Sequence, residues 1–179
     1  MAVENKQIYI VMSQTGTVLS RFLKLVTRQA YNHASISLKE DLGEMYSFGR
    51  KNPYNPFWGG FVTESKDFGT FKRFYKTRVQ VLALTVSAEK YQQIYDQLQQ
   101  MLADPDRYHY NYWGLVFAAF HIPVTGTNRY YCSEFIRDLL KQYGIEGAER
   151  LSAVIHPNHF AALPGVQTVY CGLLQEFKV

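Results

Sequence analysis

Two apolar patterns of different period constrain the fold of this chain most strongly. Apolar and polar residues alternate over residues 31–38, which predicts a strand headed by His33, with Ala34, Ile36 and Leu38 on its apolar face. From Cys132 onward, apolar residues recur every three or four positions until Gly144 supplies a stop, which predicts a helix of about three turns that opens at Cys132.

The remaining patterns predict the order strand, helix, sheet, helix, helix, strand. They favour an α+β fold in a single domain over residues 1–179, a length sufficient for a core without disulfides. The predicted elements are a strand at 8–12, an amphipathic helix with Val18, Phe22, Leu25 and Val26 on its apolar face, a hairpin of strands at His33 and Glu44 joined by 39–43, a strand at 78–84, a helix capped by Ser87 and ended at 104–105, and a terminal strand at 168–174.

The segment 50–76 is rich in aromatic residues and lacks clear periodicity. Prolines and the Gly59-Gly60 pair punctuate it, which predicts an ordered loop folded on its own side chains. Such a loop fits either a lid over an active site or a flap that completes the core.

Charge and terminal segments exclude some classes of protein. The N-terminus has no signal-peptide core and no run reaches membrane-spanning length, so we expect a cytoplasmic protein with reduced thiols. The net charge is +4, and several of the basic residues form a cluster among aromatic residues. Such a cluster could bind an anionic headgroup, an acidic peptide or single-stranded nucleic acid, but no nucleic-acid motif accompanies it. The cluster is Lys66, Lys72, Arg73, Lys76 and Arg78.

Cys132 is the candidate nucleophile. A thiol at a helix N-terminus lies at the positive end of the helix dipole, which favours the thiolate. The same spacing puts Cys132 on the apolar stripe, so a small buried residue is the alternative interpretation. The other cysteine, Cys171, lies in the predicted terminal strand, where we expect a small buried residue.

A nucleophilic cysteine needs a base, and His33 is the best-placed of the five histidines. A histidine at the head of a strand can reach a helix N-terminus packed on the sheet, although a surface histidine fits the same pattern. The other histidines have no ligand spacing with a cysteine or carboxylate, so we expect no metal and no cofactor.

The order of Tyr31-Asn32-His33-Ala34-Ser35-Ile36-Ser37 before Tyr131-Cys132-Ser133-Glu134-Phe135-Ile136 resembles the circularly permuted NlpC-type papain-like proteins, which include relatives of lecithin retinol acyltransferase. In that group the histidine strand precedes the cysteine helix. The resemblance covers roughly residues 8–140. It implies a permuted papain-like fold, with an antiparallel sheet or partial barrel packed against helices, one of which carries the cysteine at its N-terminus.

The resemblance also implies residue roles. Cys132 matches the nucleophile and His33 the base, and the third position, which orients the imidazole, falls near Ser47. A serine stabilises imidazolium less well than a carboxylate, so Glu44, Asn32 or a backbone carbonyl are alternatives. Tyr131 could add a phenolic hydrogen bond at the substrate carbonyl.

These roles imply a thiol-dependent hydrolase of amide or peptide-like bonds, acting on a small-molecule, peptide-like or lipid substrate through a thioester. Two alternatives stay open. One is a thiol acyltransferase or lipid-directed hydrolase, and the other is a ligand-binding module that keeps the fold without turnover.

Overall fold

The structure, a computed structural model, describes residues 4–16 and 29–178. Its strands are β1 (Asn5–Gln14), β2 (His33–Ser37), β3 (Met45–Asn52), β4 (Asn55–Glu64), β5 (Arg78–Ser87), β6 (His109–Tyr110), β7 (Arg129–Tyr130) and β8 (Gln167–Leu173). Its α-helices are α2 (Gly69–Arg73), α3 (Ala88–Ala103), α4 (Tyr112–Ala118) and α5 (Cys132–Gln142). Short 3-10 helices are η1 (Pro105–Arg107), η2 (Ala148–Arg150), η3 (Pro157–Ala162) and η4 (Leu174–Glu176).

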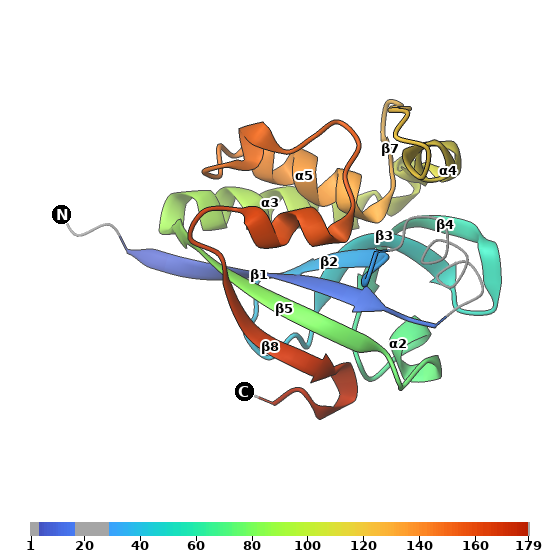
Figure 1. Ribbon diagram of the computed structural model, residues 1–179, viewed down its shortest axis with the longest axis horizontal. Helices are drawn as coiled ribbons and strands as arrows, with labels where there is room; N and C mark the ends of the chain where they lie inside the picture. The colour runs from blue at the N-terminus through green and yellow to red at the C-terminus, as the bar shows by residue number, and fades with distance from the viewer. Residues whose placement is uncertain (1–3, 17–28, 179) are drawn as a thin grey trace.

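One sheet organises the molecule. Its eight strands follow the order β7-β6-β4-β3-β2-β1-β5-β8, and all neighbours are antiparallel except β6 and β7. Helices α3 and α5 lie on one face, and α2 lies on the other (Figure 1). The architecture is therefore α+β with a mostly antiparallel sheet, as the sequence predicts.

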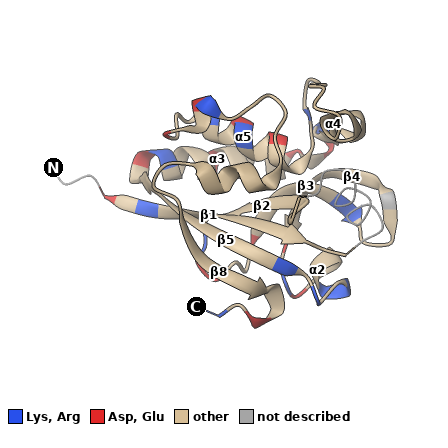
Figure 2. Ribbon diagram, viewed as in Figure 1, with Lys and Arg blue, Asp and Glu red and all other residues tan. Residues whose placement is uncertain are grey.

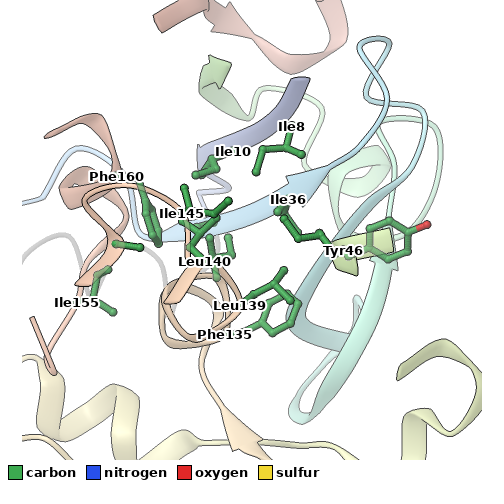
Figure 3. Packing of buried hydrophobic residues seen from close by; sticks show 14 of the residues in the cluster. Ile8, Ile10, Ile36, Tyr46, Phe135, Leu139, Leu140, Ile145, Ile155 and Phe160 are labelled. Carbon is green, nitrogen blue, oxygen red and sulfur yellow. The ribbon is translucent and has the colours of Figure 1, made fainter. Parts of the chain in front are cut away.

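The larger part of the core lies between the sheet and the face that carries α5. Alternate residues of β1 and β2 contribute Ile8, Ile10 and Ile36, which pack against Phe135 and Leu140 of α5 (Figure 3). Full burial of one such side chain contributes about 1.5–3 kcal/mol, so the apolar stripe of α5 fixes how this helix sits on the sheet. A smaller cluster on the opposite face is built around Val11, Val79 and Phe71.

Most predicted elements are confirmed. The predicted strands correspond to β1, β2, β3, β5 and β8, and the predicted helices correspond to α3 and α5. The Ser87 side chain caps α3 by accepting from the Lys90 N–H, and Gly144 follows α5 with a φ of 59°, the left-handed conformation that ends a helix. The helix predicted around Val18 to Val26 lies outside the described residues.

The prediction of an irregular loop over 50–76 is wrong. β3 continues to Asn52, β4 returns antiparallel to it, and α2 follows. The glycines that suggested a turn lie inside β4, where neighbouring backbone comes very close. A Cβ on Gly59 would lie 2.7 Å from the Tyr112 hydroxyl and 3.0 Å from the Gly49 carbonyl oxygen.

This close approach makes Gly59→Ala a test of the hairpin. We expect the substitution to lower the free energy of unfolding by about 1–3 kcal/mol, because Tyr112 and the Gly49 backbone must move. Urea unfolding measures the loss. Gly43→Ala is the matched control, since its Cβ would meet the carboxylate end of the exposed Asp41 side chain and should change stability by no more than about 0.5 kcal/mol. Equal losses in the two variants would contradict this account of Gly59.

The two cysteines of the chain, Cys132 and Cys171, do not form a disulfide. Both cysteines are free, and Cys171 is exposed, so the prediction that it is buried is wrong. Its β8 lies at the sheet edge, where the sulfur is 3.7 Å from the Tyr31 hydroxyl.

Among residues 4–16 and 29–178, none of the helices combines the length and hydrophobicity needed to cross a bilayer.

Candidate active site

Cys132 is the first residue of α5, as predicted, and its side chain is buried. The helix start is held by Glu134, whose carboxylate accepts from the Tyr131 N–H at 3.3 Å and from the Asn111 amide at 3.2 Å. Because the first N–H groups of a helix have no intrahelical acceptor, the Cys132 sulfur lies in a positive field.

His33 heads β2 and is bound by a carboxylate. Its Nε2–H donates to both oxygens of Glu64, at 3.1 and 3.0 Å. The Ser35 hydroxyl donates to Glu64 Oε2 at 2.6 Å, which fixes the carboxylate in turn. With Nε2 occupied by Glu64, Nδ1 is the ring nitrogen left to exchange a proton with a nucleophile.

The imidazole of His33 and the thiol of Cys132 lie close enough for each group to shift the pKa of the other. Burial by itself raises the pKa of the Cys132 thiol, but the hydrogen bond and positive charge of His33 outweigh it and lower that pKa below its ordinary value. Burial likewise opposes the imidazolium, yet the charge of Glu64 and the bond to Cys132 raise the pKa of His33 well above its usual range. These directions together favour a thiolate–imidazolium pair.

Two smaller contacts also favour the thiolate. The backbone N–H of Ala34 further lowers the pKa of the thiol, and the Ser133 hydroxyl lies 3.9 Å from the sulfur. Both donors stabilise negative charge on sulfur, which adds to the effect of His33.

Ser47 does not make the contact predicted for it. Its hydroxyl is buried and donates to the Ala34 carbonyl oxygen at 2.6 Å. Ser47 therefore supports the peptide group beside Cys132, and Glu64 contacts the imidazole.

Two tyrosines lie near the thiol. The Tyr131 hydroxyl accepts from the Ile155 N–H at 3.3 Å, and burial raises the pKa of Tyr131 to about 12. Burial and then the charge of Cys132 raise the pKa of Tyr110 well above its usual value. Both phenols consequently stay protonated at neutral pH and are hydrogen-bond donors.

A small groove opens at Cys132. Residues of α4, η3 and the segment before β2 line it, and its cavity of about 20 Å³ has room for roughly one water molecule. His156 belongs to this lining, and burial followed by the nearby His159 and His121 lowers the pKa of His156. The part of the chain that the structure describes holds no group of three His, Cys, Asp or Glu side chains suited to a metal ion.

The opposite side of the imidazole is closed by Phe71 of α2. The two ring centroids are 6.2 Å apart, and the Phe71 side chain is fully buried. A buried aromatic ring excludes water from the ion pair, which strengthens the attraction between Glu64 and His33.

The sequence predicts Cys132 and His33, which the structure brings together, and it misses Glu64. Phe61, Val62 and Thr63 are strand-forming residues directly before it, and they are the signal that could have placed this carboxylate at the end of a strand beside β3. The preceding Gly-Gly pair, interpreted as a turn, hides that signal.

No family model and no curated protein matches the chain.

Proposed function

We propose that this protein is a thiol-dependent hydrolase of amide or peptide-like bonds. The observation that carries the proposal is the linked series of Glu64, His33 and Cys132, with the thiol at a helix N-terminus and its pKa lowered. Inert buried cysteines have raised pKa values, whereas catalytic cysteines have a basic partner that is itself oriented by a third group.

The reaction follows from this arrangement. The Cys132 thiolate attacks the substrate carbonyl carbon, and the carbonyl electron pair moves to oxygen. The oxyanion collapses as the protonated His33 gives its proton to the leaving amine, so the C–N bond breaks and a thioester remains. Water then attacks the thioester, His33 takes its proton, and the product is a carboxylic acid with the thiolate restored.

Donors for the oxyanion are available near the sulfur. The N–H of Cys132 is one of the helix-initial groups without an intrahelical acceptor, and the phenols of Tyr131 and Tyr110 carry protons. Glu64 keeps the imidazole oriented through both half-reactions.

A permuted papain-like fold is part of the same proposal. It is supported by a histidine strand that precedes the cysteine helix in the chain, and by the packing of that helix on β2 and β3.

The proposal is tested by trapping the covalent intermediate. The protein is incubated with a panel of short peptide amides and N-acyl amides, and the reaction is quenched in acid. After digestion, the mass of the peptide that contains Cys132 is measured by mass spectrometry. We expect a transient acyl adduct that decays to free acid, and no adduct in Cys132→Ala.

Two other outcomes would replace the proposal. Transfer of the acyl group to an added amine in preference to water would make the protein an acyltransferase. A Cys132 thiol that forms no adduct and titrates like a free cysteine would make the fold a binding module.

A further inference from the structure

The end of the molecule that carries α4 exposes an unusual set of large apolar side chains. Trp113 is 71% exposed and Phe120 is 66% exposed, and Val116, Phe117 and Ile122 lie on the same stretch of chain. We call these five residues the α4 patch. The spacing of Trp113, Val116, Phe117 and Phe120 is that of one helical face, and α4 carries no charged residue (Figure 2).

The tip of the β3–β4 hairpin adds a second exposed group at the same end (Figure 1). Phe57 is 84% exposed, and Tyr54 and Trp58 are also exposed. The two groups belong to touching elements, because Gly59, next to Trp58, lies against the hydroxyl of Tyr112, the residue before Trp113. Soluble proteins seldom expose so many large apolar side chains without a partner.

The segments that carry these groups contain cations and no acidic residues. Residues 45–63 and 107–133 contain no Asp or Glu, although they contain Arg50, Lys51, Arg107 and Arg129. Of the four acids that bound these stretches, Glu64 and Glu134 are buried, Glu44 is paired with Lys39 at 3.2 Å, and Asp106 is paired with Lys51 at 2.6 Å. On the hairpin, the Arg73 guanidinium lies 4.1 Å from the centre of the Tyr54 ring.

Exposed Trp, Tyr and Phe bordered by Lys and Arg form the composition that binds at a bilayer surface, where rings enter the headgroup region and cations meet anionic lipids. We propose that the α4 patch and the β3–β4 hairpin tip form a docking surface for an anionic lipid bilayer.

This surface adjoins the groove at Cys132. Leu115 and Ala118, on the inner side of α4, line that groove, while Trp113 and Phe117 face out from the same helix. Docking would hold the groove close to the membrane surface. The proposal does not depend on the proposed hydrolase activity, since its test measures binding alone.

The chain contains two tryptophans, Trp58 and Trp113, and both belong to the proposed surface. The test therefore follows tryptophan emission and co-sedimentation of the full chain with phosphatidylcholine vesicles that contain or lack phosphatidylglycerol. We expect the protein to bind the anionic vesicles and its tryptophan emission to shift to the blue. The blue shift should persist in Trp58→Phe, where Trp113 is the remaining tryptophan, and in Trp113→Phe, where Trp58 remains. Binding should weaken as salt is raised.

Substitutions distinguish binding through this surface from nonspecific adsorption to vesicles. Trp113→Ser and Phe120→Ser should each lower the partition coefficient about tenfold or more, and Arg129→Gln about fivefold. Val169→Ser is the matched control, because Val169 is 50% exposed on β8 and should leave binding unchanged.

Three results would overturn the proposal. These are absence of binding to anionic vesicles, equal binding to neutral vesicles, and a loss in Val169→Ser as large as that in Trp113→Ser. Sedimentation velocity tests whether a second copy of the chain binds this surface instead. If the protein does not bind vesicles but forms a dimer that dissociates in Trp113→Ser, the surface is a dimer interface.

Discussion

Replacing His33 with alanine is expected to slow alkylation of Cys132 by iodoacetamide at mildly acidic pH by about two orders of magnitude. The substitution removes the hydrogen bond and the positive charge that lower the pKa of the thiol, whereas the burial that raises this pKa remains. At a pH two units below its pKa, only about one thiol in a hundred is ionised, and the thiolate is the reactive species.

The measurement is a rate of alkylation against pH, followed by mass spectrometry of the peptide that contains Cys132. Cys171 serves as an internal reference in the same sample, because it is exposed and lies on β8. Its rate should be the same in the parent and in His33→Ala. Parallel pH profiles for Cys132 in the two proteins would mean that the imidazole does not ionise the thiol, and the proposed mechanism would fail.

Replacing Glu64 with glutamine is expected to slow hydrolysis by about two to four orders of magnitude, once a substrate is known. Glutamine has nearly the same volume, but it removes the charge that raises the pKa of His33 and it can present an N–H to Nε2. The imidazole then loses both its preferred tautomer and the stabilisation of its protonated form. Titration of the His33 ring by NMR should show its pKa shifted downward in Glu64→Gln.

Ser47→Ala is the matched control for Glu64→Gln. It removes a buried hydroxyl that supports the Ala34 carbonyl and does not contact the imidazole. We expect it to lower the free energy of unfolding by about 1–3 kcal/mol and to change turnover by only a few fold. A loss of turnover in Ser47→Ala equal to that in Glu64→Gln would return the orienting role to Ser47.

The parts of the site that could be predicted from sequence are those carried by local patterns. The helix that opens at Cys132 follows from apolar spacing and from Gly144, and the strand that begins at His33 follows from strict alternation. Both patterns describe a segment and its neighbouring face, so they hold without knowledge of the rest of the chain.

The contacts that could not be predicted depend on pairing between segments. Glu64 reaches His33 only because β4 pairs with β3, and two glycines that allow this close pairing look like turn residues in sequence. Cys171 is exposed because β8 ends up at the edge of the sheet, a position that its apolar pattern does not specify. The nearness of Tyr110 to Cys132 likewise depends on β6, a strand of two residues.

The reactive pair is divided between two distant parts of the polypeptide. His33, Ser35, Glu64 and Phe71 all come from the first half, whereas Cys132 arrives with α5. During synthesis, His33 and Glu64 therefore emerge from the ribosome well before Cys132. Until α5 docks on β2, the sulfur has no imidazole partner and behaves as an ordinary thiol, so the activated thiolate arises only in the folded protein.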